Sequence, residues 1–260
     1  MLANYHTHTI RCKHAKGTER EYIEAAIKKG FKILGFSDHV PFPYPNGFVS
    51  TIRMDMNELE NYVTTLLDLR KEYKNDIDIL IGFETEYQKR YLEPLYRELA
   101  NYPIDYMLLG QHFVEDEIHG IYSGDPCYDE KGLSDYVNLC IEGMKTGLFA
   151  YLAHPDLFHF AGDETTYLKH MKRLIQASID MDFLLEINIH GFLERRHYPG
   201  NLFFKTASDM GARFIIGCDA HDPSVIVNPE DISLLYNFIK INDIKYGNNI
   251  LQGLKKPFYK

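Results

Sequence analysis

Short apolar segments alternate with amphipathic ones along the whole chain, and this alternation restricts the fold more than any other feature. A strand followed by a helix, repeated seven times, predicts a parallel sheet with right-handed crossovers between its strands. The expected strands are largely apolar, which indicates a sheet that is buried on both faces. They are expected at residues 2–5, 31–36, 77–83, 104–109, 148–153, 183–189 and 213–217.

The helices between these strands are predicted from apolar spacing and from end signals. Thr18 and Glu21 form a capping box that begins the first helix, and Gly30 stops it. No glycine-rich phosphate-binding motif follows any strand, so the usual nucleotide signals of an open doubly wound sheet are missing. An open sheet and a closed barrel both fit the alternation, and 260 residues suit one α/β barrel. The later helices are expected at residues 57–73, 92–101, 133–146, 164–181, 202–210 and 229–240.

The composition argues against several classes of partner. The formal net charge of −9 argues against binding along nucleic-acid phosphates. No apolar run approaches the ~18 residues of a membrane-spanning helix, so no membrane partner is expected. The first residues do not resemble a secretory signal, and the four scattered cysteines form no C-x-x-C pair. We therefore expect a cytoplasmic protein with reduced thiols.

Side chains that bind metal ions stand at the end of every expected strand. Each position alone could be a surface side chain near a turn, but seven repetitions make that explanation hard to sustain. In α/β barrels, active sites are built at the C-terminal ends of the strands. The residues at these ends are His6, His8, Asp38, His39, Glu84, Glu86, His112, His154, Asn188, His190, Asp219 and His221.

The spacing within the first and last of these clusters predicts a common direction. Residues two apart on a strand share a face, so His6 and His8 can face the same barrel mouth. Asp219 and His221 have the same spacing. His14 lies on the loop after the first strand and is close in sequence to the first pair.

Spacing alone says less about which residue binds metal in the second and third clusters. Asp38 and His39 are adjacent and would face opposite ways on a regular strand, so we expect His39 to bind metal and Asp38 to orient an imidazole. Glu84 and Glu86 are two apart, and their spacing cannot choose between them.

The donor types restrict the metal. Imidazole and carboxylate ligands without thiolate suit zinc, manganese or iron better than calcium. Nine candidates are too many for one tetrahedral ion, so two or three divalent transition-metal ions with a bridging carboxylate are expected. The nine are His6, His8, His14, His39, Glu84, His112, His154, Asp219 and His221.

Short motifs around these ligands resemble those of the polymerase and histidinol phosphatase (PHP) superfamily. They occur in the family order from residue 6 to residue 221, and together they are highly specific. The resemblance implies an α/β fold, a distorted (β/α)7 barrel, with a single metal-dependent phosphoesterase domain over residues 1–260. The motifs are His6-Thr7-His8, Ser37-Asp38-His39, Gly82-Phe83-Glu84, Gly110-Gln111-His112, Ala153-His154-Pro155 and Asp219-Ala220-His221.

The resemblance also implies a trinuclear site and a division of the ligands among its ions. It selects Glu84 over Glu86 as the bridging carboxylate. By family position, the first ion takes His6, His8, Glu84 and Asp219, the second takes Glu84, His112 and His154, and the third takes His14, His39 and His221.

Within the superfamily, the stand-alone histidinol-phosphatases look most similar. The similarity rests on residues 38–42, 81–87 and 109–113 and on Arg53-Met54. It implies hydrolysis of L-histidinol phosphate to L-histidinol and phosphate, in histidine biosynthesis, by a metal-bound hydroxide. The alternatives are a PHP phosphodiesterase or exonuclease acting on nucleotides or oligonucleotides, and a non-catalytic module stabilised by metal. The excess of acidic over basic residues counts against the phosphodiesterase or exonuclease. The complete set of metal ligands counts against the non-catalytic module.

Residues outside the ligand set are expected to bind the substrate. Arg195 or Arg196, after the sixth strand, could offer a planar guanidinium to the phosphate. Glu115, or one of the two acidic residues that follow it, could pair with the ammonium group of histidinol phosphate. Asn188 is a further candidate for substrate binding.

Leaving-group protonation and closure of the pocket complete the expected mechanism. Asp38 or a metal-bound water could supply the proton to the leaving alkoxide. Two loops, Pro41–Thr51 and Gly124–Gly132, are expected to close the pocket around the alcohol portion of the substrate.

Overall fold

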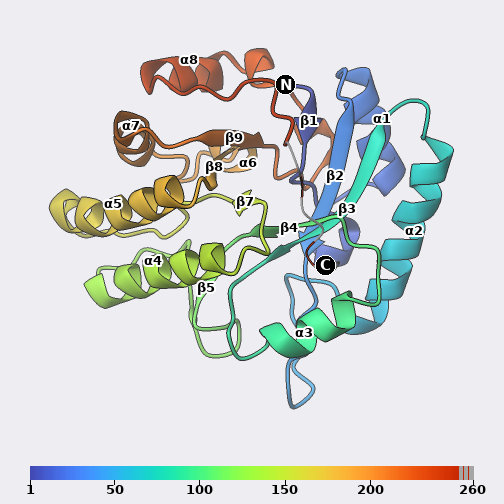
Figure 1. Cartoon of the computed structure of the whole chain (residues 1–260), viewed down its shortest axis with the longest axis horizontal. Helices are drawn as coiled ribbons and strands as arrows, with labels where there is room; N and C mark the ends of the chain where they lie inside the picture. Colours follow the sequence, from blue (N-terminus) through green and yellow to red (C-terminus); the bar gives the residue numbers. More distant parts are fainter. Residues whose placement is uncertain (252–253, 255–256, 258–260) are drawn as a thin grey trace.

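Seven parallel strands form a nearly closed barrel at the centre of the molecule, in the order β1-β2-β3-β4-β7-β8-β9 (Figure 1). The computed structural model describes residues 1–251, 254 and 257. The expected domain of residues 1–260 therefore ends in residues 252–253, 255–256 and 258–260, which lie outside the described part. The strands are β1 (Ala3–Asn4), β2 (Ile33–His39), β3 (Asp78–Thr85), β4 (Tyr106–Leu109), β7 (Tyr151–Leu152), β8 (Leu184–Asn188) and β9 (Phe214–Gly217).

The barrel closes just beyond the ends of its first and last strands. Thr7 and Ala220 form a parallel bridge there. The amide of His8 donates to the carbonyl of Ala220 (3.0 Å), and the amide of Ala220 donates to the carbonyl of His6 (3.2 Å). The closing bonds therefore lie among the residues that carry the first and last candidate ligands.

The side chain of Asn249 also joins the first strand to the last, closer to the middle of these strands. The Asn249 amide nitrogen donates to the carbonyls of Ala3 (2.8 Å) and Ile216 (2.7 Å). Its carbonyl oxygen accepts the amide hydrogen of Ile216 (2.8 Å). Asn249 thus joins β1 to β9 where the backbones of these short strands do not pair directly.

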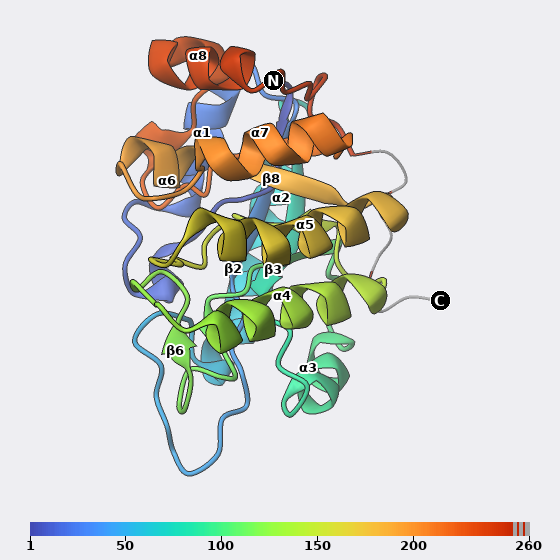
Figure 2. The same cartoon turned by 90° about the vertical axis from the view of Figure 1, so that its left-hand side faces the viewer.

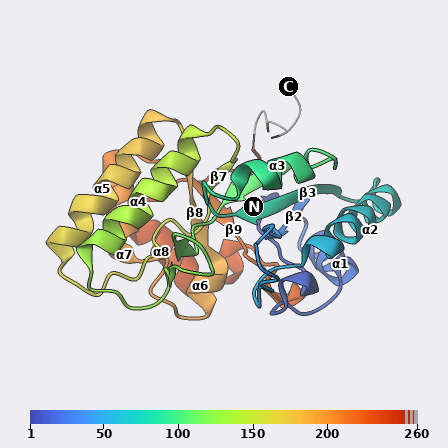
Figure 3. The ribbon, with the colours of Figure 1, turned by 90° about the horizontal axis from the view of Figure 1, so that it is seen from below.

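Helices cover the outside of the barrel, with α1 and α2 on one side and α4, α5 and α7 on the other (Figures 1 and 3). Figure 2 shows α4, α5 and α7 lying side by side, and both neighbouring pairs are in contact. The helices are α1 (Glu19–Lys28), α2 (Leu59–Glu72), α3 (Leu92–Leu99), α4 (Glu130–Lys145), α5 (Glu164–Asp180), α6 (Ile189–Leu193), α7 (Asn201–Met210) and α8 (Ser233–Ile241). Among the residues that the structure describes, no helix is both long and apolar enough to cross a bilayer.

The predicted helix ends of α1 are confirmed. The Thr18 side chain accepts from the amide of Glu21, and the Glu21 carboxylate accepts from the amide of Thr18. Gly30 follows the helix with a φ of +81°, a conformation that glycine adopts without steric cost.

Large side chains fill the barrel interior below the strand ends. Tyr106 is fully buried there, and its hydroxyl donates to the carbonyl of Tyr5 (2.6 Å). A Cβ at Gly82 would lie 2.6 Å from the Tyr106 ring, and one at Gly35 would also collide with it. Two glycines on neighbouring strands therefore make room for this ring.

Three parts of the fold differ from the sequence prediction. A hairpin of β5 (Phe113–Val114) and β6 (Ile121–Tyr122) and the short helix α6 were not expected. The helix predicted over residues 229–240 is divided into a 3-10 turn, Pro229–Asp231, and α8. The division occurs because Ile232 adopts an extended conformation between the two pieces.

Candidate metal centre

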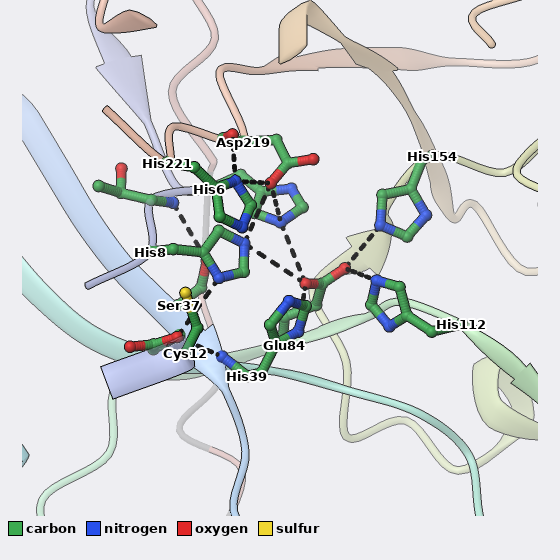
Figure 4. Close-up of polar contacts among 12 residues, drawn as sticks. His6, His8, Cys12, Ser37, His39, Glu84, His112, His154, Asp219 and His221 are labelled. Atoms are coloured by element: carbon green, nitrogen blue, oxygen red, sulfur yellow. Dashed lines mark hydrogen bonds and ion pairs between the residues drawn. The ribbon is translucent and has the colours of Figure 1, made fainter. Parts of the chain in front are cut away.

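The structure brings all nine predicted ligands together at the C-terminal end of the barrel, and Figure 4 labels all of them except His14. Glu84, at the end of β3, lies in the middle of the group, and its two carboxylate oxygens face different sets of imidazoles. The nine residues are the ones predicted: His6, His8, His14, His39, Glu84, His112, His154, Asp219 and His221.

Four donor atoms on one side of Glu84 are spaced as a tetrahedral metal shell requires. His6 Nε2 lies 3.4 Å from both Glu84 Oε2 and Asp219 Oδ1. His8 Nε2 lies 3.5 Å and 3.0 Å from the same two oxygens. Metal–ligand bonds of about 2.1 Å in a tetrahedron separate neighbouring ligand atoms by roughly 3.4 Å. Both imidazole nitrogens and Glu84 Oε2 are buried without a hydrogen-bond partner, so this donor set fits a metal ion.

The other oxygen of Glu84 faces a second set of imidazoles. Glu84 Oε1 lies 2.7 Å from His154 Nε2 and 3.3 Å from His112 Nε2. One carboxylate therefore contacts two groups of ligands. The geometry places Glu84, and not Glu86, between them.

A third group contains only imidazoles. Ligand atoms of His14, His39 and His221 all lie within 4.8 Å of one another. His221 Nε2 and His39 Nδ1 are buried without hydrogen-bond partners, and His39 Nδ1 lies 3.1 Å from Glu84 Oε2. His39 thus presents its other ring nitrogen to the centre, in contrast to His6 and His8.

Most of these imidazoles are fixed through the nitrogen that points away from the centre. The Nδ1 atoms of His14 and His221 donate to backbone carbonyls of Cys12 (2.7 Å) and Asp219 (3.0 Å). Carboxylates contact the Nδ1 atoms of three further imidazoles. These pairs are His6 with Glu186 (2.8 Å), His8 with Asp38 (3.4 Å) and His112 with Glu86 (3.1 Å). Such partners fix the tautomer and the ring orientation of metal-binding histidines.

Sequence reasoning missed Glu186, which is fully buried on β8. Besides holding His6, its carboxylate accepts from the amide of His154 (3.0 Å) and from the Asn188 side chain (2.9 Å). A Cβ at Gly217 would lie 2.5 Å from its Cδ, so this glycine makes room for the carboxylate. The available signal was a lone carboxylate within an otherwise apolar strand.

Two predicted residues support the ligands from behind. Asn188 is buried, and its side-chain nitrogen donates to Asp219 Oδ2 (3.0 Å). Asp38 is fully buried and accepts from the amide of Thr9 (3.1 Å) as well as contacting His8. Neither side chain lines the pocket described below, although Asn188 was expected to bind substrate and Asp38 to supply a proton.

The buried charges at the centre do not balance without cations. Five carboxylates are buried there, and Arg53 is the one guanidinium buried beside them. Uncompensated charge in a protein interior is strongly unfavourable. Divalent ions would compensate these carboxylates, so the acidic cluster also fits two or three metal ions. The five carboxylates are Asp38, Glu84, Glu86, Glu186 and Asp219.

Neighbouring positive charge lowers the pKa of Glu84, Glu86 and Asp219 in spite of their burial. Burial raises the pKa of Asp219, yet the charge of His6 contributes to holding it well below its usual range. Burial also opposes ionisation of Glu86, but Arg53 outweighs it and the pKa falls to about 2. Burial lowers the pKa of His221, which favours the neutral imidazole that binds metal.

A pocket opens directly onto this centre. Its volume of about 340 Å³ is within the range of small-molecule sites. Candidate metal ligands form one part of its wall, and apolar and aromatic side chains form most of the rest. The lining residues are Ile52, Phe113, Tyr122, His190, Arg196 and Tyr198, with the candidate ligands His14, His39, His112, His154, Asp219 and His221.

Of the four residues expected to bind substrate, Arg196 alone lines this pocket. It lies beside Tyr198, whose hydroxyl accepts from Arg196 Nη1 (3.4 Å). Arg195 is exposed and does not line the pocket. Glu115 is also exposed and lines a separate surface cavity, so it is not placed to pair with a substrate ammonium in this pocket.

The pocket wall also differs from the prediction. Neither Pro41–Thr51 nor Gly124–Gly132 lines it. Ile52, one residue beyond the first loop, takes part instead, together with Phe113 and Tyr122 of the β5–β6 hairpin. The hairpin was missed because its two-residue strands carry no apolar periodicity.

Comparisons with known proteins agree with this fold. A family model described as the PHP domain matches residues 4–190. A Deinococcus radiodurans protein named a probable histidinol-phosphatase is 26% identical over 239 residues, which cover 86% of this chain and 88% of that protein. Histidinol-phosphatase of Bacillus subtilis is 29% identical over 143 residues, or 52% of each chain.

A solved structure shows the same architecture. It is a histidinol phosphate phosphatase from Lactococcus lactis in complex with zinc, L-histidinol and phosphate. The TM-score is 0.71 with 18% sequence identity, and the alignment covers 94% of this chain and 95% of the other. This similarity establishes the fold of the chain.

Proposed function

The chain belongs to the PHP domain family, and on that premise we propose that it hydrolyses L-histidinol phosphate to L-histidinol and phosphate. The observation that carries the proposal is a pocket of small-molecule size that opens onto a nine-ligand metal centre. The Deinococcus radiodurans and Bacillus subtilis relatives named as histidinol-phosphatases support this substrate. Hydrolysis of a phosphomonoester is the reaction class that such a centre serves.

We assign the nine candidate ligands to three ions, with Glu84 shared between two of them. Glu84 would take part in holding two ions, because its oxygens contact separate groups of imidazoles. The first ion is assigned to His6, His8, Glu84 and Asp219, the second to Glu84, His112 and His154, and the third to His14, His39 and His221. When bound, such ions activate water for attack and neutralise charge on the phosphoryl oxygens.

The protein's own residues bind and orient the substrate. Arg196 projects a planar, permanently charged group into the pocket and is suited to a bidentate contact with phosphate oxygens. Ile52, Phe113 and Tyr122 offer an apolar and aromatic wall to the alcohol portion. Asp38 does not reach the pocket, so we propose that it positions His8 and does not protonate the leaving group.

A phosphodiesterase or exonuclease is not favoured. Such enzymes need cationic side chains along the path of a polymer backbone. Among the described residues that line the pocket, Arg196 is the only Arg or Lys, and the formal net charge of the chain is −9.

We also propose the setting in which the enzyme acts. All four cysteines are free, which is consistent with the reducing cytoplasm. The proposed product, L-histidinol, is an intermediate of histidine biosynthesis. We propose that residues 1–260 work there as one catalytic domain.

The test compares hydrolysis of L-histidinol phosphate with that of sugar phosphates, a nucleoside monophosphate and single-stranded oligonucleotides. We expect the highest kcat/KM for L-histidinol phosphate, loss of turnover with a chelator, and recovery with divalent metal. His154→Gln should lose most of the rate, whereas His119→Gln, at an exposed histidine outside the pocket, should keep it. Faster cleavage of oligonucleotides, or equal rates on all monoesters, would overturn the substrate assignment.

A further inference from the structure

Arg53 is a buried cation that the proposed reaction does not use. It lies on the loop between β2 and α2, and its side chain is 1% exposed. Arginine is almost never fully buried unless acidic groups pair with it. Its neighbour Ile52 lines the pocket, whereas Arg53 does not. The role of Arg53 therefore has to be found among its partners.

All three guanidinium nitrogens of Arg53 donate hydrogen bonds. Nη2 and Nη1 donate to the two oxygens of Glu86, at 2.8 Å and 3.2 Å. Nε donates to Glu117 Oε2 (2.7 Å), and Nη1 also donates to the carbonyl of Val40 (3.2 Å). Arg53 thus joins three segments: the end of β2, the end of β3 and the loop of the β5–β6 hairpin.

The Glu86 oxygen that accepts from Arg53 Nη2 also contacts a candidate metal ligand. Glu86 Oε1 lies 3.1 Å from Nδ1 of His112. The opposite ring nitrogen of His112, Nε2, lies 3.3 Å from Glu84 Oε1. A continuous line of contacts therefore runs from Arg53 through Glu86 and His112 to the bridging carboxylate.

We propose that Arg53 is a positioning residue for the second metal ion, acting through Glu86 to hold the His112 ring in its binding orientation. The inference rests on the metal centre of the proposed function and not on its substrate. Its geometric basis is that two-point contact with Arg53 leaves the Glu86 carboxylate no freedom to rotate. His112 is then held by an acceptor whose position is itself fixed.

The same arginine also positions the pocket wall. Glu117, which accepts from Arg53, accepts from the hydroxyl of Ser50 (2.6 Å) through its other oxygen. The loop that carries Ile52 is thereby tied to the hairpin that carries Phe113. Loss of Arg53 should therefore affect substrate binding as well as the metal ion.

Lysine cannot replace this arrangement. The three guanidinium nitrogens of Arg53 donate to four acceptor atoms, whereas an ammonium is a compact point charge without a planar fork. Arg53→Lys keeps the charge but removes the two-point contact with Glu86. It therefore separates the effect of geometry from the effect of charge.

The experiment measures Zn²⁺ affinity by competition with a chromogenic chelator for the wild-type chain, Arg53→Lys and Arg70→Lys. Arg70 is the matched control, because it also pairs with a largely buried carboxylate, that of Asp105, but lies outside the pocket and the ligand cluster. We expect Arg53→Lys to weaken the binding of one ion by up to roughly tenfold, the lower end of the usual effect of losing an outer partner, because Glu86 itself remains. The other ions and Arg70→Lys should keep wild-type affinity.

Activity supplies a second readout that a structural defect would not reproduce. The turnover of Arg53→Lys should fall at low Zn²⁺ and recover as Zn²⁺ is raised, while KM stays elevated. Wild-type affinity for every ion in Arg53→Lys, or an equal loss in Arg70→Lys, would overturn the proposal. If Arg53→Lys does not fold, Glu86→Gln is measured instead, because it weakens the same contact from its other end, and wild-type affinities there would overturn the proposal equally. A wild-type chain that binds Zn²⁺ but does not cleave histidinol phosphate refutes the substrate and leaves this comparison intact.

Discussion

Gly110 offers a way to move the bridging carboxylate without changing a single ligand. It follows β4, and its amide donates to the carbonyl of Thr85 (3.1 Å). A Cβ at Gly110 would lie 2.7 Å from Glu84 Cδ and closer still to Oε1, whereas real Cβ contacts essentially never fall below 3.0 Å. Its φ does not lie in the left-handed region, so alanine is conformationally allowed and the collision is the main perturbation.

The size of the effect follows from how far the carboxylate must retreat. Clearing the new methyl group requires a displacement of roughly 1 Å at Oε1, while metal–ligand distances tolerate only about 0.2 Å. A misplacement of ~1 Å at an active site can cost about 100-fold in rate, or roughly 2.7 kcal/mol. Because Glu84 serves two ions, Gly110→Ala should lose metal as well as rate.

The assay measures kcat/KM for L-histidinol phosphate together with metal content by elemental analysis. Gly132→Ala is the control, since a Cβ there meets its neighbours at 3.3 Å or more and sits inside α4. We expect Gly110→Ala to fall by about 100-fold with fewer ions per chain, and Gly132→Ala to stay close to wild type. Full metal content with a rate within a few-fold of wild type in Gly110→Ala would refute the role given to Glu84.

Three further predictions concern single residues. Glu84→Gln should reduce kcat more than Glu86→Gln, because Glu84 contacts two ligand groups; steady-state kinetics with equal effects would contradict this. Arg196→Ala should raise KM for histidinol phosphate by roughly tenfold or more, because a charge-assisted hydrogen bond to the phosphate is lost. Arg195→Ala should leave KM unchanged, because Arg195 lies outside the pocket. A larger KM effect in Arg195→Ala than in Arg196→Ala would show that the wrong arginine was chosen. Burial lowers the pKa of His197 to about 4, so the unfolded chain takes up this proton first and the folded state loses stability as pH falls from about 6.5 towards 4. His197→Gln should reduce that loss in urea unfolding at pH 7 and pH 4.5, and an unchanged difference between the two pH values would refute the assignment.

The ligand positions could be predicted because strand ends leave few choices. His6, His8 and Glu84 each follow an apolar run, and the parallel arrangement brings such positions to one end of the barrel. The seven-strand fold follows from the same alternation. Its confirmation by the structure shows that local periodicity was sufficient for the seven parallel strands. The closed barrel was implied by the resemblance to the PHP superfamily, because an open sheet fits the same alternation.

The residues behind the ligands were harder to predict. Glu186 has no periodic partner in the sequence, and its role depends on a contact with His6 across 180 residues. Arg53 was noticed only as part of a motif, since nothing local indicates that its side chain reaches Glu86. Arg196 and Arg195 are adjacent, and only the turn after α6 decides which of them faces the pocket.

The seam between the first and last strands also sets the order of assembly during synthesis on the ribosome. The N-terminal strand emerges first, yet it remains an unpaired edge on this side until β9 and then Asn249 have been made. His6 and His8 must likewise wait for Asp219, near the other end of the chain. A nascent chain therefore carries these imidazoles without Asp219, and the first set of candidate ligands is complete only after translation has passed the final strand.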